Sequence, residues 1–140
     1  MIVVASSVWI DFFRGIATPA VQRFRQLMAE GVAQIVVLNV VLYEVLRGFR
    51  HEREFRQARA LLQALKIEPA VGENLALQAA EHYRHLCAAG YTVKCAVAIL
   101  LGAFCLENGY TLLQQDRDFD MMHALHCTAR AAGVDGYDLR

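Results

Sequence analysis

Several features are scarce or missing in this 140-residue sequence, and each absence removes a class of protein. Only two prolines and no low-complexity tract are present, which excludes a fibrous or disordered chain. The four cysteines show no C-x-x-C spacing, so we expect reduced, buried thiols rather than a metal or dithiol motif. Acidic and basic residues balance at 14 each, so no net charge points to a nucleic-acid partner.

Long hydrophobic runs are also missing. The most continuous apolar stretch, residues 95–106, is too short to cross a bilayer. The N-terminal apolar run is broken by Asp11 and Arg14 and does not have the layout of a signal peptide. We therefore expect a cytoplasmic protein with no membrane contact. The turn after the first apolar run, VASSVW, contains no glycine-rich phosphate loop, which argues against a flavodoxin-like ligand-binding domain.

What is present is a regular alternation of short apolar runs and helical patterns. With 56% hydrophobic residues, the chain is predicted to be one domain, residues 1–140, with a large core. Strands are expected at residues 1–4, 34–38, 67–69 and 110–113, with a weak last one after 133. Helices are expected at residues 8–13, 19–30, 40–47, 49–66, 73–89, 95–107 and 121–131. This alternation predicts an α/β fold with a mostly parallel sheet of about four or five strands.

Acidic residues follow several of these elements. Ligands of open parallel sheets bind at the carboxyl ends of the strands, and the first strand ends at Ala5, which can do no chemistry. Glu44 is a lone acid in an apolar helix, and Asp116 and Asp118 follow the strand at 110–113. Carboxylates converging there would form a hard-oxygen site for Mg²⁺ or Mn²⁺, as in nucleases. The alternatives are a solvated helix face for Glu44 and turn or capping roles for the two aspartates.

Four stretches of the chain together resemble the PIN-domain ribonucleases, and specifically the VapC-type toxins of bacterial toxin–antitoxin pairs. In order they are VVASSVWIDFFRG, NVVLYEVLRGFR, GYTVKCAVAILLGAFCLENGYTLL and QDRDFD. The resemblance implies a PIN-like three-layer α/β/α sandwich. It also implies a metal-dependent endoribonuclease of a type II toxin–antitoxin module, which uses Mg²⁺ or Mn²⁺ held by four acids to hydrolyse RNA.

Two of the four acids that the resemblance implies are absent. The second acid falls on Glu44, within LYEVLRG, and the last on Asp116, with Asp118 as a helper. The first should occupy the position of Ala5, in V-D-[ST]-S-V-W, and the third that of Ala98, in T-V-[RK]-x-x-[VI]-D. Because the neighbours of both alanines keep the family pattern, we interpret the losses as targeted inactivation. A natural, nuclease-dead PIN-fold binding module is the alternative.

Two further residues are candidates for contacts with substrate. Ser7 could donate a hydrogen bond to a phosphate, or simply belong to the turn, and Lys94 could meet the scissile phosphate or be a solvated lysine. The arginines between Arg47 and Arg59 are interleaved with acids, which favours a solvated or partner-binding face. The resemblance implies a cognate VapB-type antitoxin, an RNA substrate, a homodimer, and operator DNA bound only through the antitoxin.

Overall fold

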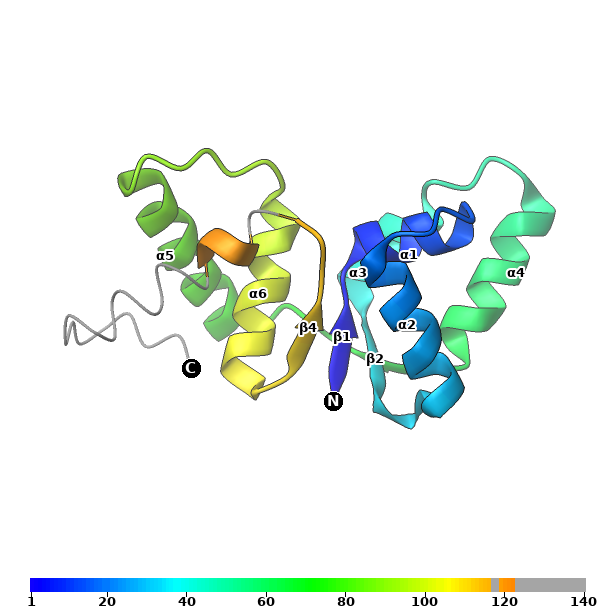
Figure 1. Cartoon of the computed structure of the whole chain (residues 1–140). Helices are drawn as coiled ribbons and strands as arrows, with labels where there is room; N and C mark the ends of the chain where they lie inside the picture. Colours follow the sequence, from blue (N-terminus) through cyan, green and yellow to red (C-terminus); the bar gives the residue numbers. More distant parts are fainter. Residues whose placement is uncertain (117–118, 123–140) are drawn as a thin grey trace. The chain divides into compact units, whose positions relative to one another are not determined.

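The computed structural model describes residues 1–116 and 119–122, which fall into two compact units (Figure 1). Unit 1 consists of Met1–Pro69 and Thr111–Gln115. Unit 2 consists of Ala70–Tyr110 together with Asp116 and residues 119–122 of the described chain.

The sheet lies in unit 1 and has four parallel strands in the order β3-β2-β1-β4. The strands are β1 (Ile2–Val4), β2 (Ile35–Leu38), β3 (Lys66–Glu68) and β4 (Thr111–Leu113). All four residues of β2 are buried, as expected of a β-branched run in the interior of a parallel sheet. The α/β class and the parallel sheet predicted from the alternation of elements are therefore confirmed.

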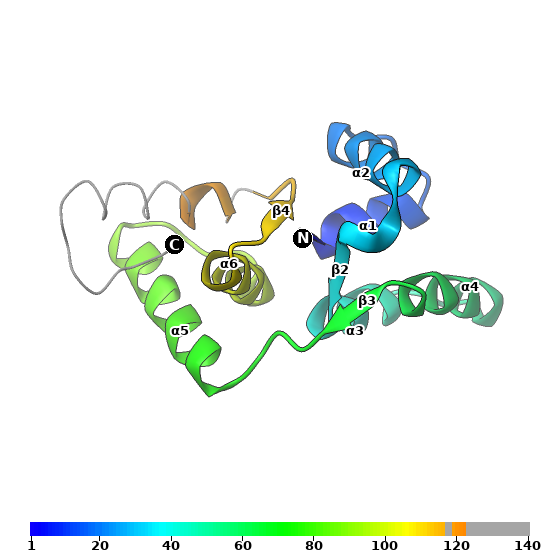
Figure 2. The same cartoon turned by 90° about the horizontal axis from the view of Figure 1, so that it is seen from below.

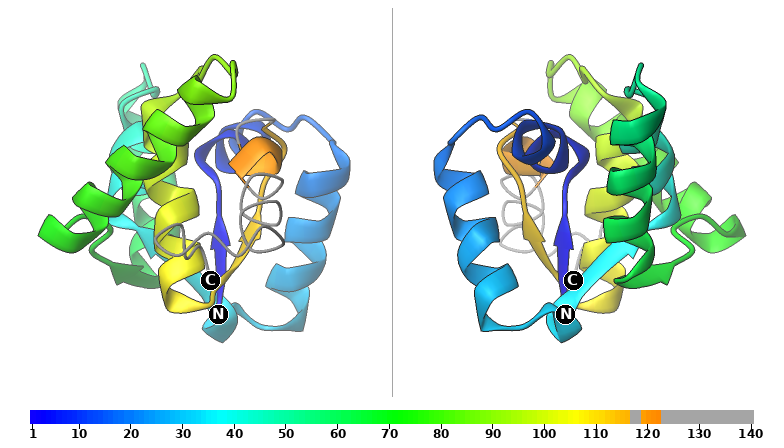
Figure 3. Two further views of the ribbon diagram at one scale, coloured as in Figure 1. Left: turned by 90° about the vertical axis from the view of Figure 1, so that its left-hand side faces the viewer. Right: turned by 90° about the vertical axis from the view of Figure 1, so that its right-hand side faces the viewer.

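The strand order makes the β1–β4 pair a topological switch point, because the connections after β1 and before β4 lead to opposite sides of β1. From β1 the chain moves to β2 on one side, and it returns later to pair β4 on the other side (Figure 3). Val4 pairs with Leu113, and the amide of Ala5 extends this ladder by donating to the Leu113 carbonyl at 2.9 Å. In open parallel sheets such a switch point, at the carboxyl ends of the strands, is the usual place for a ligand.

The remaining elements of unit 1 are helical, and Figure 2 shows them around the sheet. They are α1 (Ser6–Phe13), α2 (Pro19–Glu30), a 3₁₀ helix (Val32–Gln34), α3 (Asn39–Leu46) and α4 (Glu52–Gln63). α1 packs against α2 and α3, and α3 packs against β2 and α4. The contact between α1 and α2 is aromatic. The ring centroids of Trp9 and Phe24 lie 4.6 Å apart, and both residues are fully buried.

Unit 2 is built from α5 (Glu73–Ala88), α6 (Ala96–Asn108) and the helical residues 119–122. α5 packs against α6 (Figure 1), and Leu86 and Ile99 are in the buried cluster that joins them. Gly109 adopts φ 66° and ends α6 in the left-handed conformation that glycine permits. Gly102 allows the side chain of Met122 to pack closely against α6, because a Cβ at position 102 would lie 2.7 Å from the sulfur of Met122.

The structure corrects several predicted details. The helix expected at 40–47 begins one residue earlier, at Asn39, and ends at Leu46. The helix expected at 49–66 spans only Glu52–Gln63, because His51 is extended and Lys66 pairs with β2 instead of continuing the helix. Cys87 and Cys95 are exposed rather than buried.

Part of the predicted C-terminal region lies outside the described residues. Of the helix expected at 121–131, residues 121 and 122 are helical, and the rest falls outside the described chain, as does the weak strand expected after residue 133. Within the part of the chain that is described, no helix combines the length and apolar character needed to span a membrane.

Candidate functional site

The site predicted from the sequence begins at the carboxyl end of β1, where Ala5 stands. Its backbone is extended (φ −67°, ψ 153°), and it is the N-cap residue of α1. The methyl group is 1% exposed and offers no oxygen to cap the helix. An acid at this position would therefore lie at a buried strand end that faces the first amides of a helix.

Glu44 lies close to this strand end. It stands on α3, which starts directly after β2, the strand next to β1 in the sheet. The hydroxyl of Ser6 donates to Oε1 of Glu44 at 2.7 Å, and both side chains are half-buried. Glu44 is thus held beside the start of α1 rather than on a solvated helix face. Unit 1 brings together two of the predicted acid positions, Ala5 and Glu44.

The other predicted positions lie elsewhere in the chain. Ser7 is half-buried in α1 of unit 1. Lys94 is exposed ahead of α6, Ala98 is buried within α6, and Asp116 is half-buried three residues after β4. These last three belong to unit 2, and Asp118 lies outside the described residues. That both sets of acid positions form one site remains a prediction.

Within the described part of the chain, the side chains present do not by themselves form a site for a divalent metal ion. Among residues 1–116 and 119–122, no three His, Cys, Asp or Glu side chains gather closely enough to hold one. Mg²⁺ and Ca²⁺ need several oxygen ligands, whereas Ala5 and Ala98 supply methyl groups where the family pattern has carboxylates. A divalent metal ion would therefore have to be held here without ligands from positions 5 and 98.

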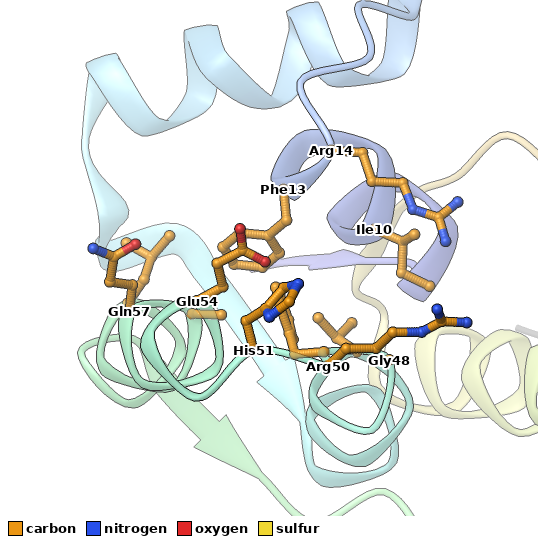
Figure 4. Close-up of a pocket in the computed structure, with 12 residues that line it drawn as sticks. Ile10, Phe13, Arg14, Gly48, Arg50, His51, Glu54 and Gln57 are labelled. Atoms are coloured by element: carbon orange, nitrogen blue, oxygen red, sulfur yellow. The ribbon is translucent and has the colours of Figure 1, made fainter.

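Unit 1 also contains a pocket of about 780 Å³, and neither Ser6 nor Glu44 is among the residues that line it. It lies between the end of α1, the end of α3 and α4 (Figure 4). Its apolar lining consists of Ile10, Phe13, Val45, Phe49, Ala58 and Leu61. The polar lining is mainly basic, with Arg14, Arg50 and His51 accompanied by Glu54 and Gln57. The guanidinium groups of Arg14 and Arg50 lie on the same side of the pocket, and Gln57 lies at the other end (Figure 4).

One hydrogen-bonded cluster was not predicted from the sequence. The side chain of Gln115 bonds to Asp11 of α1 and to Thr18 at the start of α2. These partners are 104 and 97 residues away along the chain, so no local pattern could signal them. Trp9 of α1 is fully buried and belongs to the core.

Comparison with known proteins identifies a matching family model and similar curated proteins. The family model described as PIN domain matches residues 2–125. Two similar curated proteins are "VapC ribonuclease Mb1587" of Mycobacterium bovis and "Ribonuclease VapC11" of Mycobacterium tuberculosis. Each is 27% identical over 125 residues, which is 87% of this chain and 91% of the relative.

A solved structure is similar as well, the crystal structure of VapBC2 from Rickettsia felis bound to a DNA fragment from their promoter. The matched chain aligns with a TM-score of 0.69 and 15% identity, over 87% of this chain and 93% of the other. This match establishes a shared α/β fold.

Proposed function

Because the chain belongs to the PIN domain family, we propose that it is a VapC-type endoribonuclease toxin in which alanine at two acid positions abolishes hydrolysis. The observation that carries this proposal is the bond between Ser6 and Glu44 beside the strand end at Ala5. If an aspartate at position 5 were replaced by alanine, Glu44 would still be held by Ser6 beside the end of β1, as it is here. This end of β1 lies at the switch point of the sheet, where ligands of such sheets bind.

The proposal assigns a role to each position of the family site. Asp at positions 5 and 98 would join Glu44 and Asp116 in a carboxylate site for Mg²⁺ or Mn²⁺ that hydrolyses RNA phosphodiester bonds, with Asp118 assisting. In the present chain, Ser6 still orients Glu44. Ser7 and Lys94 are assigned to the RNA phosphates. The chain therefore keeps contacts for substrate while lacking two of the ligands that hydrolysis needs.

The direct test is RNA cleavage by this chain and by its Ala5→Asp/Ala98→Asp variant, with Mg²⁺ or Mn²⁺. We expect cleavage by the variant alone, and its abolition by EDTA. The matched control is Ala60→Asp/Ala76→Asp, which adds the same two charges at exposed alanines, one in each unit. This control should remain inactive. If the Ala5→Asp/Ala98→Asp variant folds and binds Mn²⁺ but cuts none of a broad panel of RNAs, the nuclease proposal is wrong.

We further propose that a VapB-type antitoxin occupies the pocket between α1, α3 and α4. The similar structure from Rickettsia felis is of VapBC2 bound to a fragment of promoter DNA, which supports an antitoxin partner here. Because the lining combines apolar side chains with basic ones, it suits a segment that carries a bulky apolar side chain flanked by acidic residues. A homodimer, and binding of operator DNA through the antitoxin alone, complete this proposal.

The pocket can be tested with one substitution and a control. Leu61 lines the pocket, and Leu61→Glu should abolish co-purification with the antitoxin encoded beside this gene. Leu77 is 61% exposed on α5 and outside the pocket, so Leu77→Glu should leave the complex intact. Equal co-purification of both variants would show that the antitoxin binds elsewhere.

A natural binding module without nuclease activity is the second candidate function. The burial of Ala5 and Ala98 supports it, because a buried methyl group needs no polar partner. The native coding sequence distinguishes the two candidates. Aspartate codons at positions 5 and 98 would establish that the alanines were introduced, and alanine codons would favour the binding module.

A further inference from the structure

Gln115 is tied through its side-chain amide to two helices of unit 1. Its Nε2 donates to Oδ2 of Asp11 in α1 at 2.7 Å. Its Oε1 accepts from the hydroxyl of Thr18 at 3.1 Å. The same hydroxyl oxygen accepts from the amide of Val21 at 3.1 Å, which caps α2. One glutamine side chain therefore links the segment after β4 to the end of α1 and to the start of α2.

This link lies where the chain leaves the sheet at the switch point. β4 ends at Leu113, whose carbonyl accepts from the amide of Ala5. Gln115 follows two residues later, and the next residue is Asp116. Consecutive Cα atoms are about 3.8 Å apart across a trans peptide. Holding the Gln115 side chain in place therefore restricts the backbone from which Asp116 projects.

We propose that Gln115 is a positioning residue for Asp116 in RNA hydrolysis. This inference rests on the proposed function, which assigns Asp116 to the last family acid. A glutamine suits the place because its amide donates to the Asp11 carboxylate while its oxygen accepts from Thr18. Glutamate at 115 would have no donor for Asp11 and would put two carboxylates together. Both hydrogen bonds are exposed, so their loss should shift this segment without unfolding the core.

The test introduces Gln115→Glu into the full-length Ala5→Asp/Ala98→Asp chain. We expect kcat for RNA to fall about tenfold with KM unchanged, because Asp116 is displaced from its working position. The matched control is Gln26→Glu, which adds the same charge at an exposed glutamine of α2 that accepts a hydrogen bond from Arg23 of the same helix. Adding Asp11→Asn to Gln115→Glu exchanges donor and acceptor and should restore kcat to within about threefold.

A second measurement does not depend on cleavage or metal. In the chain as it stands, Gln115→Glu should speed amide hydrogen exchange at residues 114–116 about tenfold. Asp11→Asn/Gln115→Glu should slow it again, with the melting temperature unchanged in both variants. Unchanged exchange would show that the link does not hold this segment, and would overturn the inference.

The kinetic outcomes separate this inference from the proposed function. If the Ala5→Asp/Ala98→Asp chain cleaves RNA and Gln115→Glu has the same kcat, the positioning role is wrong and the nuclease function stands. If kcat falls but Asp11→Asn does not restore it, the positioning role is equally wrong. If no variant cleaves RNA, the proposed function is wrong, and the positioning role of Gln115 in hydrolysis is wrong with it.

Discussion

Replacing Ala5 by aspartate should destabilise this protein when no divalent cation is present. The side chain at position 5 is 1% exposed, and Glu44 is held nearby by Ser6. A carboxylate placed there loses solvation and meets another acid, and both effects raise its folded-state pKa above the unfolded value of about 3.9. The opposing effect is helix capping, because position 5 is the N-cap of α1 and now has no side-chain cap.

The sizes of these two opposing effects determine whether Ala5→Asp raises or lowers the free energy of unfolding. A shift of two to three pKa units corresponds to about 3–4 kcal/mol lost at neutral pH. An acid at the N-cap returns about 1 kcal/mol. The expected net loss is about 2–3 kcal/mol in the free energy of unfolding. At about 3 °C per kcal/mol for a chain of this size, the melting temperature should fall by about 6–9 °C.

The assay is thermal and urea unfolding at several pH values, with Ala5→Asn as the control. Asparagine caps the helix without charge, so Ala5→Asn should stay within about 1 kcal/mol of the parent. The loss caused by Ala5→Asp should be complete above the raised pKa and should disappear as the pH falls towards about 4. Millimolar Mn²⁺ should stabilise Ala5→Asp/Ala98→Asp but not the present chain. Ala5→Asp as stable as Ala5→Asn at pH 7.5 without metal would refute this reasoning.

Three further predictions follow from other contacts. Thr18→Ala removes the cap of α2 and should lower the free energy of unfolding by about 1 kcal/mol in urea titrations, whereas Thr18→Ser should not. Burial raises the pKa of the Cys105 thiol from 9.0 to about 12, so iodoacetamide at pH 8 should label Cys87 well before Cys105. The stability that this raised pKa contributes is complete below about pH 9 and is lost as the pH rises towards 12. Equal labelling rates of Cys87 and Cys105 would contradict the burial of Cys105. Phe24→Ala opens a cavity beside Trp9 and should cost about 3–5 kcal/mol, measured by chemical denaturation, and a cost below 1 kcal/mol would contradict the packing.

Much of the fold could be predicted from the sequence, because local chemistry governs where its elements begin and end. Thr18 and Pro19 mark the start of α2, and Gly109 marks the end of α6. The prediction was wrong where a distant partner decides the outcome. Lys66 leaves the helical pattern because it pairs with β2. The exposure of Cys87 and Cys95 likewise depends on what packs against them, which apolar composition does not reveal.

For the site, the motifs identified the individual positions but not the contacts between them. Glu44 was a candidate because it is a lone acid in an apolar helix, and an equally good candidate for a solvated face. Its bond to Ser6, which is 38 residues away, shows that the side chain is half-buried and held beside α1, and its role in a site remains a prediction. The convergence of Ala98 and Asp116 with this pair remains a prediction.

The sequence by itself determined the α/β class and the approximate places of the strands, because these depend on residue type and local spacing. That Ala5 and Ala98 stand at acid positions is implied by the family resemblance and remains a prediction. The tertiary structure alone decided the strand order β3-β2-β1-β4, the link from Gln115 to Asp11, and the pocket between α1, α3 and α4. These features depend on which distant segments meet, and the pairing of strands or side chains about a hundred residues apart has no periodic signature in a single sequence.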